Sequence, residues 1–105
     1  MDALVTAIAQ ILDYIHTQGP EAIAQLTGLL EALKVGSVYV AALFGLIANV
    51  PAVIEIISQL IALISSGAGV TEIATAIGSL AGSLGLSIES VIHILQMIGA
   101  FLLAF

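Results

Sequence analysis

The residues best spaced for chemistry in this sequence are Glu89, His93 and Gln96, which follow one another at steps of four and three. In a helix this spacing puts the three side chains on one face, as in a set of metal ligands. His16 lies far from them in the sequence, and the chain has no cysteine, which excludes thiolate metal sites and disulfides. We therefore interpret the three residues as a polar stripe that faces water or a lumen.

The sequence has no motif for nucleophilic catalysis, phosphate binding or dinucleotide binding. It has one Lys or Arg against seven Asp or Glu, for a net charge of −6, so it lacks the basic footprint of a nucleic-acid-binding protein. We expect no enzyme activity, no catalytic, cofactor-binding or metal site, and no direct sequence-specific contact with nucleic acid. A structural membrane lipid is the one small molecule that we expect the protein to bind.

Glu55 is the sharpest single candidate for chemistry. Pro51, Glu55 and Gln59 share one helix face, and a carboxylate inside a membrane is a functional candidate by default. The three residues could form an ion-carrying site like that of a rotor-ring subunit. Those subunits, however, are two long helices joined by a short polar loop with a basic residue, and the loop SSGAGVTE here has no cation. The ion carrier is therefore the least favoured interpretation of this sequence.

The chain has few charged residues to place on its surface. Hydrophobic residues make up 61% of the 105 residues and charged residues only 8%, whereas about 25–35% of the surface of a soluble small domain is usually charged. Eight charged side chains are too few for a water-soluble monomer of this size. We expect the apolar surface to face lipid, other copies of the chain, or both.

The pattern of apolar residues predicts a single all-α domain over residues 1–105. Residues 1–34 form an amphipathic N-terminal part, and residues 35–105 form hydrophobic helices with few charges. Pro20 and Pro51 fit the first turn of a helix, and Ser87 fits an N-cap. The third helix is expected to kink or break near Pro51. The five predicted helices cover residues 2–17, 20–34, 37–64, 71–84 and 87–105.

Each predicted helix has a narrow polar stripe and a wide apolar arc, the reverse of a normal surface helix. The first helix has its stripe at Asp2, Thr6, Gln10, Asp13 and Thr17, and the last at Glu89, His93, Gln96 and Ala100. Two segments are long enough to span a bilayer, namely residues 35–54, which have no charge, and residues 87–105. We expect the terminal MIGAFLLAF to be buried in lipid or in a packed wall.

Small residues recur at four-residue steps on two of these helices, which predicts close helix packing. The predicted packing residues are Ala41 and Gly45 in one helix, and Ala74, Gly78 and Gly82 in another. Lys34, the only Lys or Arg, directly precedes the uncharged run. It either reaches a lipid headgroup or pairs with Glu31, three residues earlier.

Taken as a whole, the chain resembles mating-pilus subunits: the conjugative pilins of type IV secretion systems and their archaeal DNA-import counterparts. The resemblance consists of the amphipathic pair 2–34, two long apolar stretches over 35–64 and 71–105, the small-residue loop SSGAG between them, and the hydrophobic C-terminus. It implies a hairpin-type helical subunit that is stored in the membrane and assembles into a hollow extracellular filament. It also implies that a lipid headgroup lines the lumen.

The partners implied by this resemblance are other copies of the chain, membrane lipid and the secretion machinery, and the implied use is DNA transfer. Bacterial members often have cations in the inter-helix loop, and SSGAG has none, so Lys34 is the only substitute. The main alternative is a small integral membrane protein, either holin-like, immunity-type or an accessory subunit. Membrane-surface helices are normally rich in Lys and Arg, and holins tend to end in a basic tail; this chain has neither feature.

Overall fold

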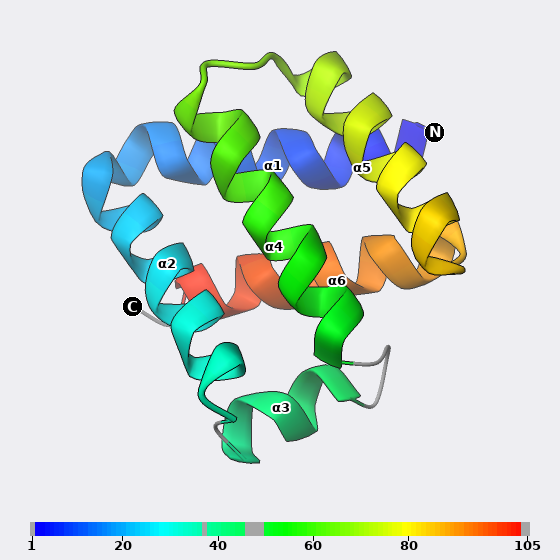
Figure 1. Cartoon of the computed structure of the whole chain (residues 1–105). Helices are drawn as coiled ribbons and strands as arrows, with labels where there is room; N and C mark the ends of the chain where they lie inside the picture. The colour runs from blue at the N-terminus through cyan, green and yellow to red at the C-terminus, as the bar shows by residue number, and fades with distance from the viewer. Residues whose placement is uncertain (1, 37, 46–49, 104–105) are drawn as a thin grey trace.

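The fold of the chain is all-α, as the sequence predicts. The computed structural model describes residues 2–36, 38–45 and 50–103, and these residues form helices and turns without a strand. The helices, shown in Figure 1, are α1 (Asp2–Gln18), α2 (Pro20–Lys34), α3 (Val38–Gly45), α4 (Val50–Ser65), α5 (Val70–Leu84) and α6 (Ile88–Leu103).

The predicted helix starts are confirmed where the sequence gives a clear signal. Pro20 is the first residue of α2, and Pro51 lies in the first turn of α4. Ser87 caps α6, because its hydroxyl oxygen accepts a hydrogen bond from the backbone amide of Ser90 at 3.1 Å. The predicted helix over 37–64 is two helices, α3 and α4, and residues 46–49 between them lie outside the described residues.

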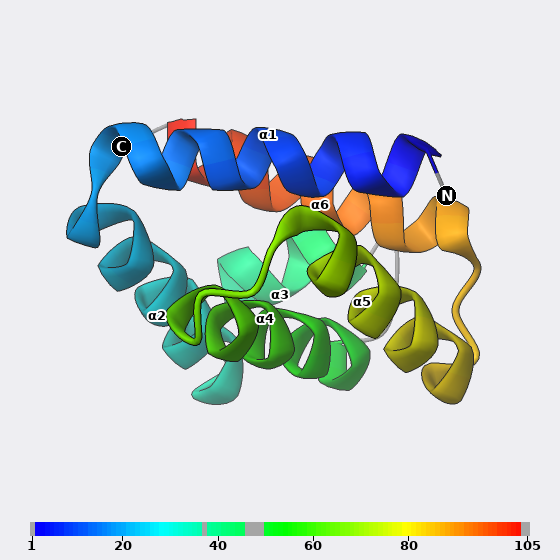
Figure 2. The same cartoon turned by 90° about the horizontal axis from the view of Figure 1, so that it is seen from above.

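The helices pack in two layers. In Figures 1 and 2, α1 and α6 lie side by side and run in the same direction, and α2, α4 and α5 pack across them. The molecule measures 32 × 30 × 20 Å. Its accessible surface is 5389 Å², close to the roughly 5,500 Å² expected of a folded chain of this mass. The chain therefore buries as much surface as an ordinary compact domain.

One apolar core joins α1, α2, α4, α5 and α6. Its buried side chains are all Leu, Ile, Val or Ala, and no polar or charged side chain is buried among the described residues. The fully buried large side chains come from all five helices: Leu4, Ile8, Leu26, Leu29, Ile56, Ile57, Leu60, Ile73, Ile77, Ile94 and Leu95.

The wide apolar arcs predicted on these five helices face one another within the chain. For these helices, the apolar arcs are covered by other helices of the same chain, so covering by lipid or by other copies, as the sequence suggested, is not required. Small or neutral polar side chains such as Ala3, Ala24, Thr75 and Ser79 are exposed instead of many charged ones. Among the described residues, large exposed hydrophobic side chains are few and unevenly distributed.

The apolar end of the chain packs against the rest of the molecule. Ile98 and Leu102 of α6 are fully buried, and Phe101 is half-buried. The Tyr14 hydroxyl of α1 donates a hydrogen bond to the backbone carbonyl of Leu102, which ties the ends of the two helices together. The expectation of a packed wall is confirmed for Ile98 and Leu102, with the wall supplied by the chain itself, whereas Leu103 is 73% exposed and residues 104–105 lie outside the described part.

None of the described helices is both long and apolar enough to cross a membrane alone. The predicted span over 35–54 begins in the turn after α2, contains α3 and ends in the first turns of α4, and residues 37 and 46–49 lie outside the described part. Helices α5 and α6 taken together are long and apolar enough to cross a membrane, but the two helices meet at a bend of 119°.

Candidate functional site

Among the described residues, the most exposed large apolar side chains lie where α2 gives way to α3. Val35, Val38 and Tyr39 are 79%, 82% and 77% exposed, whereas the other large exposed hydrophobic residues among those described, Ile88 and Leu103, lie at opposite ends of α6. Lys34, also exposed, is the last residue of α2. We call Lys34, Val35, Val38 and Tyr39 the α2–α3 corner.

A tight helix end produces this corner. The backbone amides of Val35 and Gly36 donate to the carbonyls of Glu31 and Leu33, and Gly36 has φ +80°, which favours glycine. The chain therefore leaves α2 abruptly and enters α3, which lies at the lower edge of the molecule in Figure 1 and packs mainly against α2 and α4. The sequence of α3, VYVAALFG, has no polar side chain other than Tyr39, and none of its described side chains is buried.

Lys34 is the only Lys or Arg of the sequence. Within the described part of the chain it forms no ion pair, so the predicted pairing with Glu31 is not found. The other prediction, that Lys34 meets a lipid headgroup, stays a prediction. A lone cation beside exposed Val and Tyr side chains is a suitable contact for an anion at the edge of an apolar phase.

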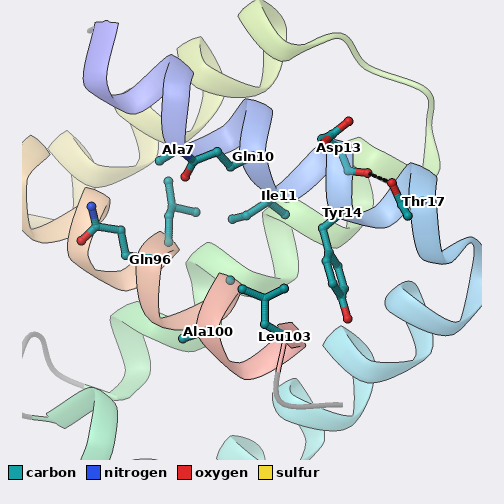
Figure 3. A pocket seen from close by; sticks show the side chains of 11 residues that line it. Ala7, Gln10, Ile11, Asp13, Tyr14, Thr17, Gln96, Ala100 and Leu103 are labelled. Atoms are coloured by element: carbon teal, nitrogen blue, oxygen red, sulfur yellow. Dashed lines mark hydrogen bonds between the residues drawn. The ribbon is translucent and has the colours of Figure 1, made fainter.

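A second feature is an elongated groove of about 500 Å³ between α1 and α6, which we call the α1–α6 groove. Figure 3 shows it from close by, with Gln10 and Gln96 on facing helices and Tyr14 extending toward the end of α6. Asp13 is its only charged lining residue, and the Asp13 backbone carbonyl accepts a hydrogen bond from the Thr17 hydroxyl at 2.9 Å. The volume lies within the usual range of ligand sites, about 300–1,000 Å³.

Small side chains keep the α1–α6 groove open. The lining includes Ala7 of α1 and Gly99 and Ala100 of α6, and a Cβ atom added at Gly99 would meet nothing within 4 Å. The groove was not predicted from the sequence. Its signal was present in the predicted polar stripes, since Gln10, Asp13 and Thr17 of the first stripe and Gln96 and Ala100 of the last line the same groove.

The predicted small-residue packing faces have different surroundings in the structure. Ala74 is buried in the core, and a Cβ at Gly78 would lie 3.8 Å from Leu4 Cδ2, so both positions pack within the chain. Gly82 is exposed, with nothing within 4 Å of an added Cβ. Ala41 is half-buried in α3. Gly45 is the last residue of α3, and its packing lies outside what the structure describes.

The titratable side chains of the described residues that we considered for chemistry do not form a cluster. Glu55 is exposed on α4, and Glu89, His93 and Gln96 are exposed on α6, as expected of a polar stripe. Over the described ranges, no three His, Cys, Asp or Glu side chains lie close enough together to hold a metal ion. The ion-carrier interpretation of Glu55 remains a prediction, and selective carbodiimide labelling of Glu55 that is blocked by the transported ion would support it.

Comparison of the chain with models of known protein families, with curated proteins and with solved structures finds no match. The resemblance to conjugative pilins therefore depends on the sequence pattern alone.

Proposed function

We propose that the protein is a non-enzymatic structural subunit that assembles with copies of itself and with membrane lipid into an extracellular filament, in the manner of conjugative pilins. The observation behind this proposal is the α2–α3 corner. Three large apolar side chains within residues 35–39 are more than three-quarters exposed there, directly after the only Lys or Arg of a strongly acidic chain. Concentrated apolar exposure of this kind marks surfaces that meet a protein or a membrane.

In this proposal the subunit enters the filament as a compact body and not as a hairpin of two long rods. Its described helices have 8 to 17 residues, and the core that joins five of them is complete within the chain. Assembly then buries the α2–α3 corner instead of whole helix faces, and each large side chain of the corner removed from water contributes about 1.5–3 kcal/mol. The membrane is the store of subunits before assembly, and secretion machinery adds them to a filament used for DNA transfer.

The test is assembly of the purified chain. It is incubated in buffer alone and with vesicles of phosphatidylethanolamine and phosphatidylglycerol, and the products are examined by negative-stain electron microscopy and sedimentation. In parallel, producing cells are sheared and the released material is identified by mass spectrometry. Filaments that contain the chain support the proposal. A chain that stays dispersed in vitro and in the membrane pellet after shearing contradicts it.

A small membrane protein, holin-like or an accessory subunit, is the second candidate. The apolar helix α3 and the bent apolar pair α5–α6 favour it. Alkaline carbonate extraction of the producing cells separates the two candidates. An integral membrane protein stays with the lipid after extraction and shearing, whereas a filament subunit is released by shearing.

A further inference from the structure

We propose that the α2–α3 corner of one copy inserts into the α1–α6 groove of a second copy, with Lys34 next to Asp13, and that this contact is the repeating joint of the filament. The inference rests on the proposed function, because it names the two surfaces through which the chain binds itself.

The two surfaces are complementary in apolar character. The corner presents Val38 and Tyr39, which are 82% and 77% exposed. The groove offers about 500 Å³, and its lining includes Ala7, Gly99 and Ala100, whose small side chains leave room for larger ones. Insertion of Val38 and Tyr39 would remove apolar surface from water on both sides of the contact.

The charges are complementary as well. Lys34 is the only Lys or Arg in the chain, and it forms no ion pair within the described residues. Asp13 is the only charged residue that lines the groove, and its side chain is exposed. Two copies with a net charge of −6 each repel one another. A contact that places Lys34 against the groove acid offsets part of this repulsion where the copies meet.

Insertion within one chain is prevented by the fold. The corner is built by the end of α2 and by α3, and the groove by α1 and α6. In Figure 1, α3 lies at the edge of the molecule farthest from α1. After binding, the copy that inserted its corner therefore still has a free groove, and the copy that received it still has a free corner. Such a heterologous contact adds copies without limit when its rotation does not close a ring.

The chain has no cysteine, so engineered cysteines can report the joint directly. The variant with Ala42→Cys and Gly99→Cys keeps Val38 and Tyr39, because Ala42 is an exposed residue of α3 one helical turn farther along. It is oxidised under assembly conditions and run on a non-reducing gel, and we expect a ladder of disulfide-linked oligomers. The matched control combines Ala42→Cys with Gly28→Cys, because Gly28 is also an unhindered glycine inside a helix but lies on α2, outside the groove. A ladder of equal strength from the control overturns the inference.

Blocking either surface gives a second test. Gly99→Leu fills the groove, and Val38→Ser with Tyr39→Ser removes the apolar corner. We expect each variant to lose at least tenfold in filament yield while its circular dichroism stays that of the wild type, and Gly28→Leu to assemble normally. Mixed together, the two blocked variants should form a two-copy complex and no filament, because one supplies an intact corner and the other an intact groove.

Charge exchange tests the Lys34–Asp13 pairing. Lys34→Glu alone should reduce assembly at least tenfold, and Lys34→Glu with Asp13→Lys should restore most of it. Lys34→Glu with Glu55→Lys is the matched control, because it also returns the net charge to −6 but changes an exposed acid outside the groove. Equal rescue by the control overturns the assigned pairing.

The outcomes separate this inference from the proposed function. If Gly99→Leu forms filaments as well as the wild type, the joint is wrong and the function stands. If the corner variant loses vesicle binding while the mixed variants form no complex, the corner binds lipid and the joint is again wrong. If the wild-type chain forms no filament with or without vesicles, the proposed function is contradicted.

Discussion

The five-helix core and the α2–α3 corner use similar apolar side chains in opposite ways. Leu26, in the middle of α2, is fully buried against other helices, whereas Val35, just past the end of that helix, is 79% exposed. Helix α4 is apolar and contributes Val53, Ile56 and Ile57 to the core; α3 is also apolar, and its described side chains are exposed or half-buried. The difference lies in what surrounds each segment, because α3 sits at the edge of the core.

This difference separates stability from recognition. Side chains in the core are already removed from water, so they contribute to the free energy of folding and have no apolar surface left for a partner. Side chains at the corner contribute little to folding and keep their apolar surface for binding. Substitutions in the core should therefore lower the free energy of unfolding strongly. Substitutions at the corner should reduce assembly and leave the free energy of unfolding nearly unchanged.

The largest expected effect on stability is at Leu26. Leu26→Ala removes a fully buried side chain and leaves a cavity, so the free energy of unfolding should fall by about 2–5 kcal/mol. Val35→Ala, at the corner, should change it by less than about 0.5 kcal/mol because the side chain is mostly in water. Urea unfolding followed by circular dichroism measures both. Equal losses for the two variants would show that the corner belongs to the core and would break the comparison.

A smaller effect is expected at two glycines of α5, which show where the packed interior ends. Gly78→Leu extends a side chain toward Leu4, 3.8 Å from the new Cβ, so crowding should lower the free energy of unfolding by about 1–3 kcal/mol. Gly82→Leu faces open space, and the better helix propensity of Leu should leave stability unchanged or raised by up to about 1 kcal/mol.

Thermal unfolding of both glycine variants measures this difference. If Gly82→Leu blocks filament formation, Gly82 packs against another copy of the chain in the filament. If a stable Gly82→Leu variant assembles normally, the prediction that Gly82 is a helix-packing residue is wrong. Gly78→Leu is not informative about assembly on its own, because Gly78 already packs within the chain.

The sequence predicted the local elements of the fold well. The helix starts at Pro20, Pro51 and Ser87 follow from chemistry that acts within one turn, namely the missing proline donor and the serine cap. The apolar arcs were also visible as helical periodicity. What these arcs pack against is a long-range property, and periodicity does not show whether an arc meets lipid, another copy or another helix of the same chain.

The candidate surfaces were only partly predictable for the same reason. Lys34 stood out as the only Lys or Arg, and Ala41 and Gly45 drew attention to α3. The exposure of Val38 and Tyr39 depends on α3 lying outside the core, which follows from the turn at Gly36 and the packing of α4. The α1–α6 groove needed the pairing of two helices whose polar stripes are about eighty residues apart in the chain, and no local rule gives that pairing.

The smallest expected effect compares the two tyrosines, one in each region. The Tyr14 hydroxyl donates to the Leu102 carbonyl in a partly buried position, so Tyr14→Phe should lower the free energy of unfolding by about 0.5–1.5 kcal/mol. Tyr39 is 77% exposed, and Tyr39→Phe should leave stability within about 0.5 kcal/mol of the wild type. Urea unfolding of both variants, supplemented by hydrogen exchange at the end of α6, measures the contrast. If Tyr14→Phe is as stable as the wild type and the end of α6 stays protected, α6 is held by its buried Ile98 and Leu102 side chains alone. If Tyr39→Phe keeps full assembly, the ring of Tyr39, and not its hydroxyl, is what the partner surface binds.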